Sequence, residues 1–223
     1  MIPQIITIDG PAGAGKSTTA RRVAEALGFV YIDTGAMYRA VTLAVLRQGI
    51  ELTDAAVTRL VQTLNVELHH GPDGQHTFLN GEDVSLHIRS AAVTNAVSAV
   101  SALPGVRRAL VEIQRRIGRQ GGVVMDGRDI GSVVFPEADV KIYLVADVDE
   151  RVRRRLAEVQ LRGEQVSEAV IRHQIVERDR LDSSRADSPL VRPQGAIDVD
   201  TTCLTIDAQV QRILDIVGEH RTV

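Results

Sequence analysis

The chain has 223 residues, enough for one α/β domain with small inserted lobes and short for two full domains. Its formal net charge is -3 at pH 7, so it lacks the basic excess typical of a nucleic-acid-binding protein. The single cysteine, Cys203, excludes an intramolecular disulfide and a multi-thiolate metal site, and no apolar run predicts a membrane helix. Because Met1–Ile5 has no signal-peptide pattern, we expect a reduced, soluble, cytoplasmic protein.

The first 50 residues alternate between strand and helix patterns. Residues 5–8 are a short β-branched run that stops at a glycine turn, which predicts a buried strand. Apolar residues recur at helical spacing over 16–27, a second strand is predicted over 29–32, and Asp33 begins a helix that ends by Gly49. Strand and helix in this alternation predict a parallel sheet with helices on its faces.

The middle of the chain has a different pattern. Alternation over 65–70 and 76–79, around a turn at 71–74, predicts a small antiparallel insert. Its histidines have no cysteine nearby, so we expect a solvated hairpin and not a metal site. The later elements predicted are mainly helix over 91–117 with a break near Pro104, strands over 122–125, 140–145 and 196–199, Arg-rich helices within 149–182, and a helix over 207–217. We expect Cys203 to be a buried thiol, because it lies in an apolar stretch.

Residues 10–17 match the phosphate-binding pattern G-x-x-x-x-G-K-[ST], and they lie between a predicted strand and a predicted helix. Glycines allow consecutive backbone N–H groups to surround phosphate oxygens, and the helix N-terminus adds partial positive charge. Lys16 would reach the β- and γ-phosphates of ATP, and the Ser17 hydroxyl would coordinate Mg²⁺. The pattern therefore predicts an ATP-binding phosphotransferase.

Two other classes of P-loop protein are disfavoured. A GTPase carries an Asn-Lys-x-Asp motif, and the sequence contains none. An oligomeric motor ATPase has an apolar strand that ends in Asp-Glu, whereas here Asp147 and Val148 intervene before Asp149 and Glu150. We interpret these two acids as the start of a helix.

Arginines paired with acids suggest what accepts the phosphoryl group. Arg128 and Asp129 directly follow a predicted strand, where open α/β sheets place their ligand crevice. Other arginines recur at helical spacing, which is also the pattern of a solvated ion-pair face. Since bringing an anionic donor and an anionic acceptor together costs Coulomb energy, arginine forks would offset that cost. The acceptor is therefore predicted to be a phosphate ester.

Several stretches, in the same order along the chain, resemble the bacterial cytidylate (CMP/dCMP) kinase family. They are residues 7–11 leading into the P-loop, 33–39 (Asp-Thr-Gly-Ala-Met-Tyr-Arg), 79–84, 125–131 with 133–136, and 177–185. The resemblance implies the P-loop nucleoside-monophosphate kinase fold, an α/β fold with a parallel five-stranded sheet flanked by helices, a small antiparallel β insert and an Arg-rich lid. It implies one kinase domain over 1–223, with a monophosphate-binding lobe and insert at about 35–100 and a lid at about 150–166.

The resemblance also assigns site residues. Those implied to bind ATP are Gly10, Ala12, Gly13, Ala14, Gly15, Lys16, Ser17, Thr18, Arg151 and Arg155. Those implied to bind CMP or dCMP are Asp33, Thr34, Arg39, Ser98, Arg107, Asp126, Arg128, Asp129, Arg178, Asp182 and Arg185. Within these sets, Ser98, Arg107 and Asp129 would face cytosine, Arg39, Arg128 and Arg185 the acceptor phosphate, and Arg178 and Asp182 the sugar. Lys16, Arg128, Arg154 and Arg185 would be catalytic.

Some points stay open at this level. Thr18 offers a second hydroxyl beside Ser17, although the general motif favours Ser17 at the metal. Another small-metabolite kinase, with an adenylate- or shikimate-type acceptor, and an ATPase without an acceptor are the alternatives. We expect a monomer, because one chain supplies both substrate sites and their lid, and we expect neither nucleic acid nor membrane as a partner.

Overall fold

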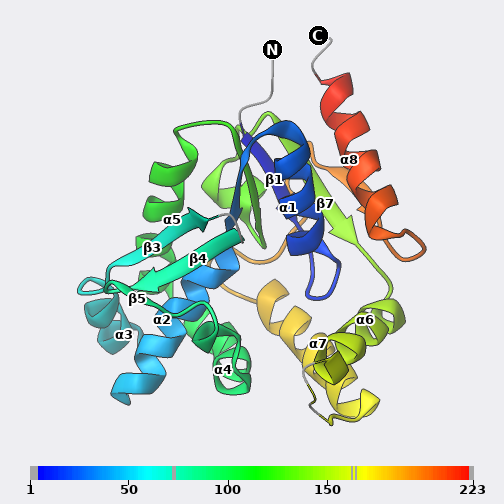
Figure 1. Cartoon of the computed structure of the whole chain (residues 1–223). Coiled ribbons are helices and arrows are strands. Elements are labelled where there is room, and N and C mark those ends of the chain that lie inside the picture. The colour runs from blue at the N-terminus through cyan, green and yellow to red at the C-terminus, as the bar shows by residue number, and fades with distance from the viewer. Residues whose placement is uncertain (1–4, 72–73, 162, 164, 221–223) are drawn as a thin grey trace. The chain divides into compact units, whose positions relative to one another are not determined.

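The computed structural model describes residues 5–71, 74–161, 163 and 165–220 (Figure 1). Pro72 and Asp73 of the predicted insert turn lie outside these residues. The chain divides into two compact units, one made of residues 1–30 and 121–223 and the other of residues 31–120. The P-loop and the Arg-rich helices belong to the first unit.

A five-stranded sheet has the strand order β2-β6-β1-β7-β8. Its strands are β2 (Val30–Asp33), β6 (Val123–Gly127), β1 (Ile5–Asp9), β7 (Val140–Val145) and β8 (Ile197–Asp200). The central strand β1 pairs in parallel with β6 on one side and β7 on the other, and Ile8 is opposite both Asp126 and Ile142. Parallel pairing places the carboxyl ends of these strands at one edge of the sheet, where the P-loop begins.

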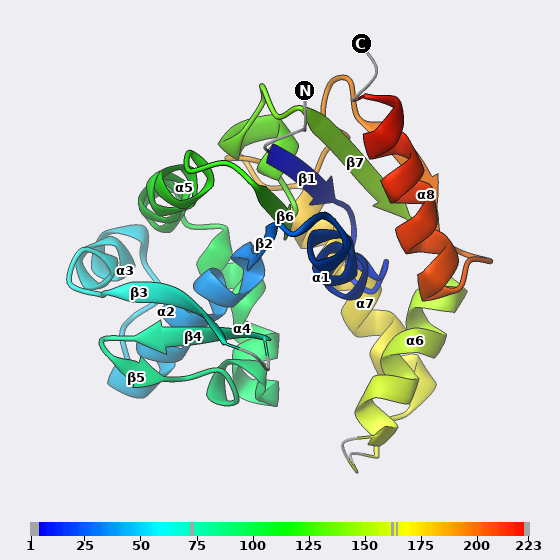
Figure 2. The same ribbon diagram turned by 45° about the horizontal axis from the view of Figure 1, so that its top comes forward.

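Helices cover the sheet of the first unit. Helices α1 (Lys16–Leu27) and α8 (Ile206–Glu219) contact each other, as Figure 2 shows. Beyond β7 the chain forms a helical pair, α6 (Val148–Leu161) and α7 (Glu168–Ser183), with a small apolar core of its own. The π-helical turn η2 (Ile130–Val134) follows β6. Buried aliphatic side chains fill the main core, as expected for a chain with 3% aromatic residues.

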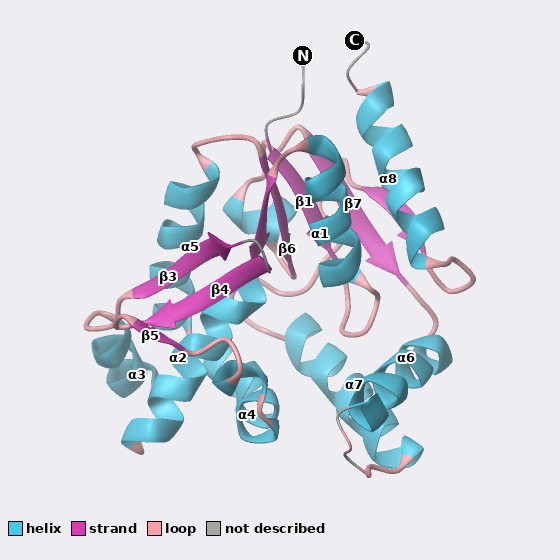
Figure 3. Cartoon of the chain, viewed as in Figure 1, coloured by secondary structure: helices cyan, strands magenta, loops and turns pink. Residues whose placement is uncertain are grey.

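The second unit combines helices with a small antiparallel sheet (Figure 3). Its helical segments are α2 (Thr34–Gln48), α3 (Asp54–Val61), the 3₁₀ turn η1 (His87–Arg89), α4 (Ala91–Ser101) and α5 (Pro104–Gly118). Its sheet has the order β3-β4-β5, with β3 (Val66–Gly71), β4 (Gly74–Leu79) and β5 (Glu82–Asp83). The apolar faces of α2, α4 and α5 share one core around Met37, Val97 and Leu110.

The predicted fold class is confirmed by the five-stranded sheet and the antiparallel insert. Helix α1 and strand β7 have the predicted bounds, and the break near Pro104 separates α4 from α5. Helix α3 was not predicted, because its pattern of eight residues is short. Among the described residues, no helix combines the length and apolar character that crossing a membrane requires.

Candidate active site

The P-loop connects β1 to α1 and needs its glycines for steric reasons. Gly10, Gly13 and Gly15 have positive φ angles, which side chains rarely tolerate. A Cβ atom on Gly10 would lie 2.2 Å from the Leu144 carbonyl oxygen of β7. The loop therefore lies against the central strands with its backbone conformation fixed by packing, which suits a preformed phosphate nest.

Lys16 is 6% exposed and donates from Nζ to the carbonyl oxygen of Pro11, at 2.7 Å. Burial lowers the pKa of Lys16 well below its ordinary value, and the positive charge of Arg128 lowers it further. An anion beside the ammonium group would reverse this effect, because a negative charge favours the protonated form. The environment of Lys16 is therefore one that a phosphate group would complete.

Ser17 and Thr18, the two candidate ligands for a divalent cation, have different surroundings. The Ser17 hydroxyl donates to Asp126 Oδ2 at 2.8 Å, whereas Thr18 is exposed. Asp126 lies near the end of β6 and is 4% exposed. A hydroxyl and a carboxylate fit Mg²⁺, which binds through few protein oxygens and takes its other ligands from water and phosphate.

Three arginines surround the buried carboxylate of Asp182. Arg128 Nε lies 2.9 Å from Asp182 Oδ2, Arg185 Nη2 lies 2.8 Å from Oδ1, and Arg178 Nε is 3.9 Å from Oδ2. Burial would raise the pKa of Asp182, but the charges of the arginines, with that of Arg128 the largest, hold it below the ordinary value. Three cations and one anion leave this cluster with a net charge of +2.

The hydrogen bonding of Arg178 within this cluster is incomplete. Burial, with a further contribution from the charge of Arg128, lowers the pKa of Arg178 to about 10. Its Nε atom is buried and has no hydrogen-bond partner among the described residues. The charges of both Arg128 and Arg178 lower the pKa of Lys16, while those of Asp126 and Asp9 raise it, so the cluster and the P-loop form one charged region in which cations and carboxylates lie close together. A phosphate group there would meet unsatisfied donors and excess positive charge.

Asp9 organises the turn that carries Arg128 and Asp129. Its two carboxylate oxygens accept from the backbone N–H groups of Ile130, at 2.9 Å, and Gly131, at 2.7 Å. Burial raises the pKa of Asp9 to about 7, in spite of these two hydrogen bonds. The residue lies 121 positions before its first partner, so no local sequence pattern pointed to this role.

Arg151 of α6 contacts the P-loop directly. Its Nη1 donates to the Ala12 carbonyl oxygen at 3.1 Å and also pairs with Asp179 of α7. Asp179 in turn accepts from the Ala12 N–H at 3.2 Å. One peptide segment of the loop is thus held by an ion pair from the two helices, and Asp179 is a site residue that the sequence did not reveal.

The other two arginines assigned to the lid have different surroundings. Arg154 Nε pairs with Glu150 at 2.8 Å, and both of its terminal nitrogens donate to Thr201. Arg155 forms an ion pair of 2.8 Å with Glu158 on the same helix, where Glu158 is mostly exposed. The roles of both residues towards ATP stay predictions.

The second unit contains the remaining residues assigned to the acceptor. Asp33 caps α2 by accepting from the Ala36 N–H, and its other oxygen pairs with Arg89, which the sequence did not single out. Thr34 is buried at the start of the same helix, and the half-buried Arg39 donates to Thr94 Oγ1 at 2.9 Å.

Ser98 and Arg107 lie on α4 and α5 of this unit. Arg107 is 1% exposed, donates to the Ser101 carbonyl oxygen at 3.1 Å, and holds its guanidinium 5.4 Å from the Tyr38 ring centroid. Ser98 is half-buried, and its own carbonyl oxygen accepts from the Ser101 hydroxyl. Ser101 therefore bridges two of the three residues assigned to cytosine.

Two expectations about single side chains had different outcomes. Cys203 is exposed, so the prediction of a buried thiol is wrong: its apolar neighbourhood belongs to the loop between β8 and α8 and not to the core. His69 and His76 of the insert pair with nearby carboxylates at 3.3 and 2.9 Å, which agrees with a solvated hairpin.

Comparison with known proteins identifies similar sequences over nearly the whole chain. A family model described as cytidylate kinase matches residues 6–219. A protein of Anoxybacillus flavithermus named cytidylate kinase is 50% identical over 216 residues, which cover 96% of each chain. A protein of Carboxydothermus hydrogenoformans with the same name is 48% identical over 98% of this chain and 99% of its own.

Solved structures with similar folds are more distant in sequence. An uncharacterized protein from Eubacterium ventriosum has a TM-score of 0.55 at 11% identity, over 96% of this chain and 98% of its own. Shikimate kinase from Bacteroides thetaiotaomicron has a TM-score of 0.50 at 13% identity, with the same coverage. At these identities the likeness concerns the fold alone.

Proposed function

The chain belongs to the cytidylate kinase family, and on that premise we propose that it transfers the γ-phosphoryl group of ATP to CMP or dCMP. The products are ADP and CDP or dCDP. The observation that carries this proposal is the charged region shared by Lys16 and the arginines around Asp182. Such a region suits two phosphate groups that must be brought together against their mutual repulsion.

In the proposed reaction, an oxygen of the acceptor phosphate attacks the γ-phosphorus, and the bond from that phosphorus to the β,γ-bridging oxygen breaks. A phosphate monoester is largely a dianion at pH 7, so the attacking oxygen needs no protein base. Lys16 neutralises charge on the donor side, while Arg128 and Arg185 hold the acceptor phosphate. Ser17, with Asp126 beside it, would hold Mg²⁺, which would supply charge neutralisation for the phosphates when bound.

The other residues assigned from the sequence keep their proposed roles. Asp129, Ser98 and Arg107 keep their assignment to cytosine, and Arg178 keeps its assignment to the sugar. Arg39 keeps its assignment to the acceptor phosphate, with Arg128 and Arg185. Asp33 and Thr34 stay assigned to acceptor binding. Arg151, Arg154 and Arg155 belong to a lid at about 150–166. For Asp182 the three surrounding arginines favour a second role, that of their counter-ion. We further propose a cytoplasmic monomer that acts without nucleic acid.

An ADP-release assay tests the function directly. ATP and Mg²⁺ are supplied with CMP, dCMP, UMP, AMP or shikimate in turn, and ADP formation is followed by a coupled enzyme. CMP and dCMP should stimulate ADP release far above the other compounds. Stimulation by AMP or shikimate alone would show a different small-metabolite kinase, and release that ignores every acceptor would show an ATPase; either result refutes the proposal.

A further inference from the structure

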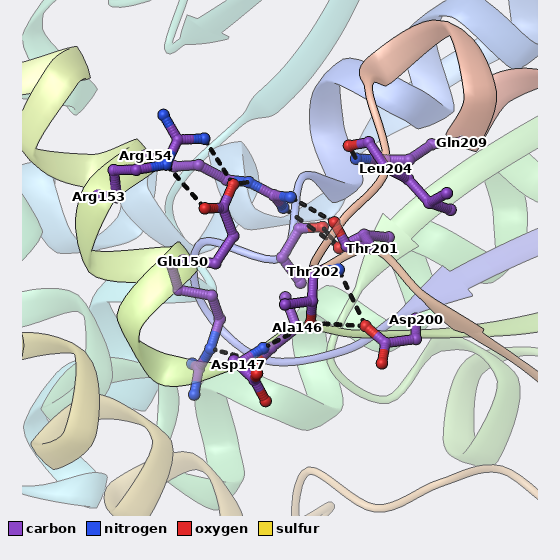
Figure 4. A network of polar contacts seen from close by, with 12 residues as sticks. Ala146, Asp147, Glu150, Arg153, Arg154, Asp200, Thr201, Thr202, Leu204 and Gln209 are labelled. Carbon is purple, nitrogen blue, oxygen red and sulfur yellow. Dashed lines mark hydrogen bonds and ion pairs between the residues drawn. The ribbon is translucent and has the colours of Figure 1, made fainter.

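A buried polar network lies behind the P-loop, around Thr201 (Figure 4). Thr201 is fully buried in the loop between β8 and α8. Its hydroxyl accepts from Arg154 Nη1 at 3.2 Å and lies 3.1 Å from the Ala14 carbonyl oxygen and 3.0 Å from that of Val145. A hydroxyl has a single hydrogen, so Thr201 donates to one carbonyl group while it accepts from Arg154. Because the Val145 carbonyl oxygen already accepts from the Thr201 N–H at 2.8 Å, we assign the hydroxyl hydrogen to the Ala14 carbonyl.

The contact with Ala14 has a geometric consequence for phosphate binding. The Ala14 carbonyl and the Gly15 N–H belong to the same trans peptide group, so they point in opposite directions. A donor that holds the carbonyl on the protein side therefore directs the Gly15 N–H away from the protein and into the nest. Arg151 likewise donates to the Ala12 carbonyl oxygen. Because this carbonyl and the Gly13 N–H belong to one peptide group, Arg151 also fixes the direction of the Gly13 N–H.

The network around Thr201 continues through polar contacts on helix α6 and on helix α8. Glu150 pairs with Arg154 at 2.8 Å, and Figure 4 shows this guanidinium extended towards Thr201. On the other side, Gln209 accepts from Thr19 of α1 at 2.8 Å and donates to the Leu204 carbonyl at 3.0 Å.

Gly15 itself lies against this network. A Cβ atom on Gly15 would come within 3.0 Å of Gln209 Oε1 and 3.6 Å of Arg154 Nη1. From the loop between β8 and α8, Thr201 thus connects the P-loop to helix α6 and to the end of β7.

We propose that Thr201 is a positioning residue for the phosphoryl donor, which fixes the Ala14–Gly15 peptide so that its N–H group is aimed at the phosphates of ATP. The inference rests on the proposed function, because it concerns the donor half of the same site. It assigns Thr201 no contact with ATP and no part in acceptor binding. Loss of the Thr201 hydroxyl should therefore impair the use of ATP and leave the binding of CMP nearly unchanged.

The test compares two substitutions at Thr201 that differ in one group. Thr201→Val keeps the shape and removes the hydroxyl, whereas Thr201→Ser keeps the hydroxyl. Because a small misplacement of a reacting group costs up to about 100-fold in rate, we expect Thr201→Val to lower kcat/KM for ATP by about 10- to 100-fold. The KM for CMP should stay within about twofold, and Thr201→Ser should recover most of the loss.

Thr42→Val is the matched control, since Thr42 is also fully buried but its hydroxyl donates within its own helix, to the Tyr38 carbonyl. It should lose stability without a change in the KM for ATP. Wild-type ATP kinetics in Thr201→Val, equal losses in Thr201→Val and Thr201→Ser, or a parallel rise in the KM for CMP would each overturn the inference.

Calorimetric titration of ADP and of a non-hydrolysable ATP analogue separates this inference from the proposed function. If the wild-type protein ignores CMP, the proposed function fails. A weaker affinity for the analogue in Thr201→Val, restored in Thr201→Ser, still supports the inference in that case. An affinity that is the same in both variants and in the wild-type protein refutes it.

Discussion

Replacing Asp182 by Asn removes the carboxylate that pairs with Arg128, Arg178 and Arg185 while keeping the shape of the side chain. The Asp182 side chain is 4% exposed and has direct ion pairs with Arg128 and Arg185. Removing one partner of a buried ion pair typically costs about 3–5 kcal/mol, because the remaining charge stays buried without compensation. At about 2–4 °C per kcal/mol for a chain of this size, the melting temperature should fall by roughly 6–20 °C.

Thermal unfolding and urea unfolding measure this loss, with Asp198→Asn as the matched control. Asp198 pairs with Arg192 at 2.7 Å, but both side chains are about half exposed, at 52% and 49%. An exposed pair contributes about 0–1 kcal/mol, so the control should unfold almost like the wild-type protein. A loss in Asp182→Asn no larger than that of the control would refute the reasoning.

Stabilisation by added inorganic phosphate is a second, independent test of the same cluster. Without the carboxylate its net charge becomes +3 instead of +2, so inorganic phosphate should bind more tightly. A ligand that binds only the folded state stabilises it by RT ln(1 + [L]/Kd), and the variant should therefore gain more stability from phosphate than the wild-type protein does. Equal gains would show that the arginines do not form one anion site.

Three further predictions concern other residues of the site. Ser17→Ala should raise the Mg²⁺ concentration needed for half-maximal activity by about tenfold or more, the usual effect of losing a group that orients a metal ligand. Thr18→Ala should leave this concentration unchanged, and a Mg²⁺ titration of both variants distinguishes the two hydroxyl groups. Asp129→Asn should reduce the preference for CMP over UMP in kcat/KM, because a carboxylate accepts from the cytosine amine and repels a carbonyl; an unchanged ratio contradicts the assignment. Asp9 has an ordinary pKa of 3.8 when unfolded and about 7 when folded, so the folded state binds more protons between these values. Its contribution to the free energy of unfolding should fall as pH rises through that window and level off above about pH 7, and denaturant titrations at several pH values should show a weaker dependence in Asp9→Asn.

The donor half of the site was predictable because its information is local. The P-loop pattern spans eight consecutive residues, and the helix that follows begins at the predicted Lys16. Residues that act across long separations were not predictable in the same way. Asp9 and Thr201 lie 121 and 187 positions from the backbone groups they bind, and neither belongs to a motif with a known spacing. Tertiary packing alone brings them to the site.

The arginines show why residue type and helical spacing do not determine a role. Arg154 of α6 pairs with Glu150 four residues earlier, and Arg185, just beyond the end of α7, pairs with Asp182 three residues earlier. The family resemblance implied that both arginines are catalytic. In the structure the guanidinium of Arg154 is bonded along three of its five N–H directions, to Glu150 and Thr201, which leaves two N–H groups for a ligand.

Arg185 instead pairs with Asp182, whose carboxylate also pairs with Arg128 and Arg178. An arginine bonded to carbonyl groups and its own carboxylate orients protein atoms, whereas arginines that outnumber their carboxylate retain charge for a ligand. This difference depends on which partners surround each guanidinium, and it separates the residues that aim the P-loop from those that would receive the acceptor phosphate.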